Sequence, residues 1–187
     1  DKVVDLGGGL MRVHSLPTIC AVVGILFATS TVGATTVLPL SLDDLVERSD
    51  IVAHVRVGEV RIEQRPEAPF RVTELHVVEG FKGAQREEII ELWQRGDGYS
   101  IVIGDPVLET GQEGLAFFRR VEGYTYLTAL AQSFWWIDGQ GTELTARRDL
   151  SSLNVVPFGE PRVTPPDEVL WSELREMVID GILGVTR

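Results

Sequence analysis

Short runs of alternating apolar and polar residues, separated by glycine or proline turns, fill the middle of this chain and point to a β core. The run 51–57 is rich in β-branched residues and alternates over most of its length, which is typical of a half-buried strand. We expect it to continue past Gly58 to Ile62, with a bulge or bend at the glycine. Alternation resumes over 70–78 after a proline-containing loop, so these two strands are predicted to pair as a hairpin.

Further strands follow at similar spacing. Residues 88–93 form a third candidate, and additional strands are expected over 114–121, 124–130, 134–137 and 143–145. Short strands joined by glycine turns are characteristic of an antiparallel barrel. The predicted fold class is therefore mainly β, with a closed or partly open antiparallel barrel over residues 35–163.

Helical signals occur at the two ends of this β region. Ser41 and Asp44 form an S-x-x-D capping box before a short helix expected over 42–49. A second helix is predicted over 164–181, with Thr164 as its cap, Pro165 at its first position and Gly181 at its end. Its apolar positions recur at helical spacing, so we expect it to pack on the barrel, the alternative being a helix that binds a partner. Those positions are Leu170, Leu174 and Met177 or Val178, with Trp171 beside them.

Residues 11–34 have the three parts of a secretory signal peptide. Arg12 supplies the basic start, an apolar run extends over 16–28, and small residues end the segment at 32–34. The run is shorter than the roughly 20 apolar residues of a membrane-spanning helix, so we expect cleavage rather than a retained anchor. Residues 1–10 precede the candidate initiator Met11 and are interpreted as upstream read-through. The mature protein is predicted to be periplasmic or extracellular.

Charge and cysteine content exclude several classes of function. Removal of residues 1–34 from the 187 leaves 153 residues, enough for one domain with a sizeable core. The net charge stays at −11, which disfavours binding to nucleic acid or to anionic membrane surfaces. The only cysteine, Cys20, lies in the removed segment. Disulfides, thiol chemistry and cysteine-bound zinc are therefore not expected in the mature protein.

The order of these features resembles a widespread group of exported bacterial proteins. Its members share an opening (A/S)-D-x-V-x-x-x-V, then V-x-E-x-x-K-G, then G-x-P-x-x-x-x-G-E-x-x-x-x-F. The resemblance extends over about residues 40–138, and the group in turn is similar to the netrin and tissue-metalloprotease-inhibitor module. This likeness implies an OB-like barrel and assigns no molecular activity. The positions that carry it are Ser49, Asp50, Val52, Val55, Val78, Gly80, Lys82, Gly83, Gly104, Pro106, Gly111, Gly114 and Phe117.

The chain departs from the metalloprotease inhibitors where their chemistry lies. Those inhibitors share an amino-terminal cysteine that chelates the protease zinc and is held by disulfides. The mature chain here has no cysteine, so inhibition by that mechanism is not supported.

Two histidines on neighbouring predicted strands are the strongest candidates for a metal or ligand site. If His54 and His76 face each other across the hairpin, Glu74 or Glu59 can complete a metal site. A broader alternative assembles a ligand or hydrolytic site from these histidines together with Trp93 and Asp105. Acidic glycine turns at 96–98, 104–105 and 138–139 lack the D-x-D-x-D spacing of calcium loops, so turn chemistry accounts for them. Nucleophile-elbow and phosphate-loop motifs are absent from the mature sequence.

Phe134, Trp135 and Trp136 form the most distinctive local cluster. Alternate residues of a strand face opposite sides, so Trp135 must point away from its two neighbours. The tail helix with Trp171 can cover it; otherwise the exposed ring is a binding surface.

The sequence therefore favours a non-catalytic binding module without a cofactor, which docks onto another extracytoplasmic protein. The alternative is a protein that binds a small ligand or a metal, or a hydrolase, with its site near His54 and His76.

Overall fold

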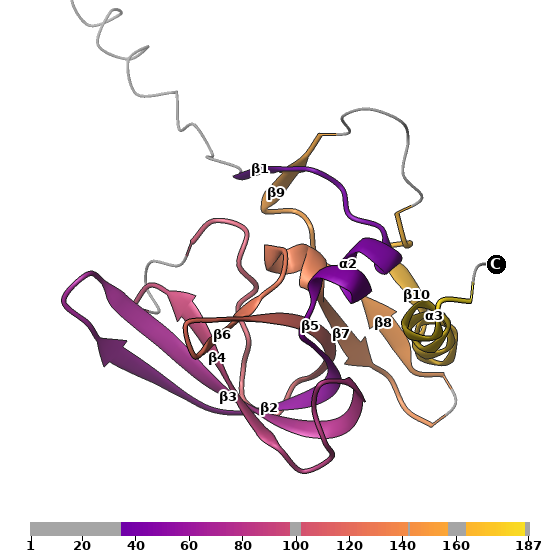
Figure 1. Cartoon of the computed structure of the whole chain (residues 1–187), viewed down its shortest axis with the longest axis horizontal. Coiled ribbons are helices and arrows are strands. Elements are labelled where there is room, and N and C mark those ends of the chain that lie inside the picture. The colour runs from indigo at the N-terminus through magenta and orange to yellow at the C-terminus, as the bar shows by residue number, and fades with distance from the viewer. Residues whose placement is uncertain (1–34, 98–101, 142, 157–163, 186–187) are drawn as a thin grey trace, which may run out of the picture. The chain divides into compact units, whose positions relative to one another are not determined.

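The computed structural model describes residues 35–97, 102–141, 143–156 and 164–185. The chain after residue 33 clusters as one compact unit (Figure 1). The predicted signal peptide and the residues before it lie outside the described residues.

A long antiparallel hairpin forms the centre of the sheet. It consists of β2 (Ile51–Gln64) and β3 (Pro69–Lys82), as the alternation predicted, although β3 continues four residues beyond the predicted end at residue 78. The register shifts between Val57 and Val60, which confirms the predicted irregularity at Gly58. A Cβ at Gly58 would lie 2.6 Å from Nε2 of the exposed His76 side chain and 3.3 Å from the Glu74 carbonyl oxygen, so a side chain there would displace the imidazole.

Five strands close partly into a ring. β4 (Ile89–Arg95) pairs with β3, and β5 (Glu113–Val121) pairs with the other edge of β2. β6 (Tyr124–Leu127) is antiparallel to the end of β5 and meets β4 in parallel through Leu92 and Thr125. The order β5-β2-β3-β4-β6, returning to β5, confirms a mainly β, partly closed barrel.

The sheet extends beyond the ring from the first half of β5. β7 (Phe134–Asp138), β8 (Thr145–Arg147) and β10 (Glu168–Leu170) follow in antiparallel order, and the 3-10 turn η1 (Leu130–Ser133) precedes β7. A separate parallel pair joins β1 (Thr35–Val37) to β9 (Leu153–Val155). The sequence analysis did not predict β1, β9 or β10.

The first helix begins at the predicted capping box. α2 (Leu42–Arg48) follows Ser41, whose Oγ accepts a hydrogen bond from the Asp44 amide at 3.1 Å. The Asp44 carboxylate in turn accepts a hydrogen bond from the Ser41 amide at 3.1 Å. This reciprocal cap satisfies two helix-end donors and confirms the start of the helix.

The tail helix begins and ends later than the sequence predicted. α3 spans Trp171–Leu183, and a left-handed Gly184 ends it, whereas the predicted cap Thr164 and first-turn Pro165 lie outside it. Residues 168–170 are extended because they pair with the open edge of β8 as β10. Gly181, expected to end the helix, lies inside α3. A Cβ there would be 3.3 Å from Asp43 Oδ1 of α2.

Two hydrophobic cores lie on opposite faces of the sheet. The ring encloses the first, in which Leu75, Leu92 and Phe118 are fully buried. The second lies between the sheet and the two helices, so α3 packs on the sheet. Members of the second core include Leu45, Phe117, Trp135, Leu174 and Val178.

Candidate binding cleft

An aromatic cleft of about 270 Å³ lies beside the loop that joins β2 to β3. Arg65, Pro66 and Glu67 supply the loop side of the cleft. Phe70, Trp93, Tyr124 and Tyr126 supply its aromatic side. We call these seven residues the aromatic cleft.

Strand order explains why these rings meet. Trp93 lies on the opposite face of β4 from Leu92, which is in the ring core. Trp93 and Phe70 belong to the paired strands β4 and β3, and their ring centroids are 5.8 Å apart. The parallel contact between β4 and β6 brings Tyr124 to 4.7 Å from Trp93, edge to face. Both spacings fall in the favourable range for aromatic pairs.

Arg65 covers this aromatic corner with its guanidinium group. Its Cζ lies 5.1 Å from the Trp93 ring centroid and 5.8 Å from that of Tyr124, within cation–π range of both. Its Nη2 donates to Glu63 Oε1 at 2.8 Å, while its buried Nε has no hydrogen-bond partner among the described residues. The Arg65 side chain is 36 % exposed, so this cover is open to solvent on one side.

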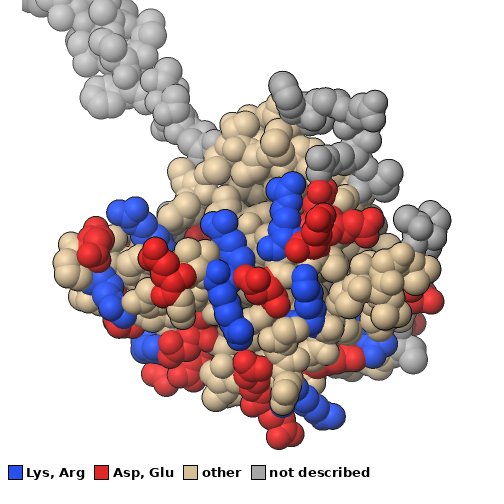
Figure 2. All heavy atoms as spheres, viewed as in Figure 1, with Lys and Arg blue, Asp and Glu red and all other residues tan. Residues whose placement is uncertain are grey.

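Carboxylates accompany the arginine at the cleft. Glu63 pairs with Arg65, and the exposed Glu67 belongs to the lining. On the face drawn in Figure 2, Lys and Arg side chains stand among Asp and Glu side chains and do not gather into one basic area. Aromatic faces flanked by carboxylates suit stacking and the recognition of a cation.

The predicted aromatic strand is occupied by internal packing. Phe134 and Trp135 are both fully buried, Phe134 in the ring core and Trp135 in the helix-covered core. The Arg148 guanidinium lies 4.6 Å from the Trp135 ring centroid. Trp136 is half-buried, with its ring 5.0 Å from Phe134. Both rings are therefore buried in the two cores, which differs from the alternative in which this strand presents an exposed binding surface.

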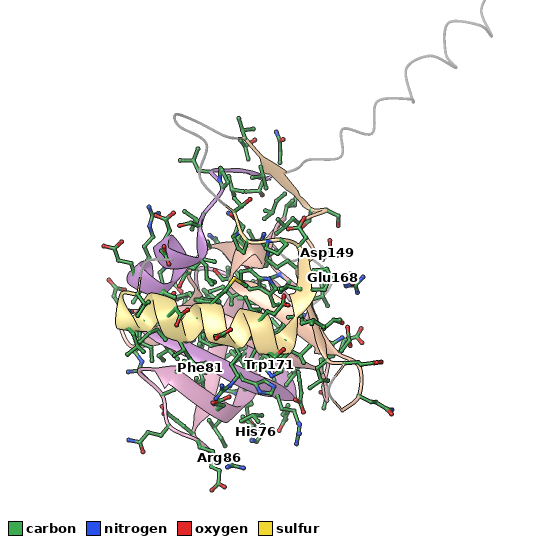
Figure 3. The ribbon with its side chains drawn as sticks, turned by 90° about the vertical axis from the view of Figure 1, so that its right-hand side faces the viewer. His76, Phe81, Arg86, Asp149, Glu168 and Trp171 are labelled. Atoms are coloured by element: carbon green, nitrogen blue, oxygen red, sulfur yellow. The ribbon has the colours of Figure 1, made fainter. Side chains whose placement is uncertain are left out.

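The two histidines are not opposite each other in the hairpin. His54 is opposite Glu79, and His76 is opposite Arg56. Figure 3 shows Trp171 and Phe81 beneath α3, with the exposed His76 farther down the sheet. Among the described residues, no cluster of three or more His, Cys, Asp or Glu side chains is arranged to hold a metal.

His54 is held in a network between the sheet and the start of α3. Its Nε2 lies 2.9 Å from Glu113 Oε2, and its ring lies 5.1 Å from Trp171. Burial lowers the pKa of His54 below 6.5, although Glu113 opposes this shift. Burial alone would raise the pKa of Glu113, but hydrogen bonding and charge from Arg56, together with His54, hold it below its ordinary value. The contact between the His54 and Trp171 rings places the first residue of α3 against β2.

Asp105 is separate from the aromatic cleft. It lies between β4 and β5, and burial raises its pKa to about 6. The next residue, Pro106, accepts a hydrogen bond through its carbonyl from the buried Gln94 side chain at 3.0 Å. Of the four residues considered for a scattered site, only Trp93 lines the aromatic cleft.

A larger hollow of about 480 Å³ lies between α2 and α3. Lys82 lines it and donates through Nζ to the Val46 carbonyl at 2.8 Å. That hydrogen bond ties β3 to α2, so this cation already has a structural role.

The sequence analysis missed Arg65, Phe70, Tyr124 and Tyr126 as site residues. Phe70 and Tyr124 were recognised only as the starts of strands, and Arg65 only as part of a loop. The signal that unites them is the parallel contact between β4 and β6, which local alternation does not encode. No protein-family model matches this chain, and no curated protein or solved structure shows significant similarity to it.

Proposed function

We propose that this protein is an exported, non-catalytic binding module that docks onto another extracytoplasmic protein through the aromatic cleft. The observation that carries the proposal is the convergence of Phe70, Trp93, Tyr124 and Arg65 on one partly open hollow. Tryptophan, tyrosine and arginine are the residue types that dominate binding energy at protein interfaces.

We further propose that the ring is an OB-like barrel related to the netrin and metalloprotease-inhibitor module. Numbered along the chain, its strands follow the order 1-2-3-5-4, and strands 3 and 5 meet in parallel. In OB folds, ligands commonly bind near the loops that join strands 1 and 2 and strands 4 and 5. Arg65 belongs to the first of these loops, and Tyr124 directly follows the second. This correspondence supports the aromatic cleft as the binding site.

Export rests on the signal-peptide pattern of residues 11–34. Among the described residues, no helix has the length and apolar character needed to span a membrane. The proposed partner is accordingly sought in the envelope and culture fluid of the source organism.

An affinity capture with residues 35–187 tests the proposed function. The wild type is compared with Tyr124→Leu, which removes one aromatic wall, and with Phe81→Leu as a matched control. Phe81 is a half-buried aromatic residue that contacts Trp171, outside the aromatic cleft. Circular dichroism first verifies that each bait is folded.

We expect one protein to be captured by the wild type and by Phe81→Leu, and to be lost with Tyr124→Leu. Capture that is equal for all three baits would show that the aromatic cleft does not bind the partner. Recovery of no protein by folded wild-type bait would contradict a stable partner.

A further inference from the structure

We infer that the aromatic cleft recognises an arginine side chain of the partner, which takes the place that Arg65 occupies in the free protein. This inference rests on the proposed function, because it identifies the kind of side chain that the same cleft binds. In the free protein, Arg65 therefore occupies the position that the ligand takes in the complex.

The geometry of Arg65 shows that the site accepts a guanidinium. Its Cζ lies over two rings at once, 5.1 Å from Trp93 and 5.8 Å from Tyr124, and these rings meet at 67°. A planar cation held against two aromatic rings gains from both ring quadrupoles, and tryptophan gives the strongest such contact. A lysine ammonium can approach the rings but cannot stack as a plane.

Arg65 is poorly secured in this place. Its ion pair is with Glu63, only two residues away, and its side chain is 36 % exposed. Among the described residues its Nε has no hydrogen-bond partner, so no hydrogen bond from Nε to these residues is broken when Arg65 leaves the rings. The loop that carries it joins two strands and is exposed at Pro66 and Glu67, so it can move without breaking the pairing of β2 and β3.

Charge favours a cationic rather than an anionic occupant. When Arg65 swings out, Glu63 and Glu67 remain beside the rings to accept hydrogen bonds from an incoming guanidinium. The chain as a whole carries a net charge of −11, which attracts a basic segment of a partner and repels an acidic one. The occupant is therefore an arginine presented on a basic stretch of protein.

Titration with N-acetyl-arginine methylamide tests the inference, with the indole signal of Trp93 and the ring signals of Tyr124 followed by NMR. N-acetyl-citrulline methylamide is the control ligand, because it has nearly the same shape without the charge. The proteins are wild type, Arg65→Gln, and Arg65→Gln combined with either Tyr124→Phe or Tyr124→Leu. Tyr124→Phe keeps the aromatic face, so it separates loss of the ring from loss of the hydroxyl.

We expect saturable shifts with the arginine ligand and none with citrulline. Removal of the internal competitor in Arg65→Gln should tighten binding by about tenfold, the size expected for one cation–π contact. Tyr124→Phe should retain that binding and Tyr124→Leu should lose it. Equal shifts from the two ligands, no shifts at all, or weaker arginine binding in Arg65→Gln would each overturn the inference.

N-acetyl-glutamate methylamide provides the opposite test. Its binding to the wild type and loss in Arg65→Gln would show that Arg65 holds an anion, which also overturns the inference. Failure of the inference is distinguishable from failure of the proposed function. Suppose that the Tyr124→Leu bait loses a captured partner, but that N-acetyl-arginine methylamide does not displace this partner from the wild type. That result would support the aromatic cleft as the docking site and would reject an arginine side chain as its ligand.

Discussion

Replacement of Leu174 by alanine tests whether α3 is a fixed part of the domain or a detachable helix. The Leu174 side chain is 0 % exposed and belongs to the core between the sheet and the two helices. Leu174→Ala removes three carbons, worth about 2 kcal/mol of transfer free energy. Phe117 and Trp135 belong to the same core, and we expect such large rings to limit collapse into the space. The cavity therefore brings the expected loss of unfolding free energy to about 3 kcal/mol.

Urea unfolding followed by circular dichroism measures this loss. For a domain of this size, an m value of about 2 kcal/mol/M converts the loss into a fall of about 1.5 M in the unfolding midpoint. Leu183→Ala is the matched control, because Leu183 lies in the same helix and is 71 % exposed. Its effect should stay within about 0.5 kcal/mol. A loss below about 1 kcal/mol for Leu174→Ala would refute the reasoning and favour a loosely attached helix.

Two further predictions concern the His54 network and the close packing of β5. Because burial lowers the pKa of His54 below 6.5, the unfolded chain binds this proton more readily, so the contribution of His54 to stability should fall as pH drops through 6.5, opposite in sign to that of Asp105, whose pKa burial raises to about 6. His54→Gln should remove this contribution, so its free energy of unfolding in urea should be less unfavourably affected than that of the wild type when pH falls from about 7.5 to about 5.5. An equal pH dependence of the unfolding free energy in the two proteins would contradict the lowered pKa of His54. Gly114→Ala would place a Cβ 2.4 Å from Phe134 Cζ and 2.7 Å from the Trp135 carbonyl oxygen. We expect it to lower the unfolding free energy by about 2 kcal/mol, whereas a neutral result would show that β7 can shift.

Local patterns predicted the elements that depend on local physics. The capping box located α2, and the alternation of β2 and β3 predicted the central hairpin. Strand alternation also separated Phe134 from Trp135, which the structure places in two different cores.

Elements that depend on distant partners were missed. β10 has three residues and becomes a strand only because β8 leaves an edge open, so a local reading extended the tail helix to Thr164. The parallel pair of β1 and β9 joins residues more than a hundred positions apart, and three-residue strands carry too few positions to show alternation.

The aromatic cleft was missed for the same reason. Trp93 stood out in the sequence as a single tryptophan, but its neighbours come from a loop and from two other strands. Tyr124 reaches it through one parallel contact, and Arg65 reaches it from a loop in which it follows no pattern. The two histidines do not face each other because the hairpin register, which begins with Gln64 paired to Pro69, places His54 opposite Glu79 and His76 opposite Arg56.

Site-specific photo-crosslinking tests the central claim most directly. A benzophenone amino acid replaces Glu67 at the aromatic cleft in one bait and Glu173, an exposed residue on α3, in another. Both baits, residues 35–187, are irradiated in envelope and culture fluid of the source organism. The account predicts one covalent protein adduct from position 67, suppressed by Tyr124→Leu, and none from position 173. An adduct that forms equally from both positions, or only from position 173, would contradict the aromatic cleft as the docking site.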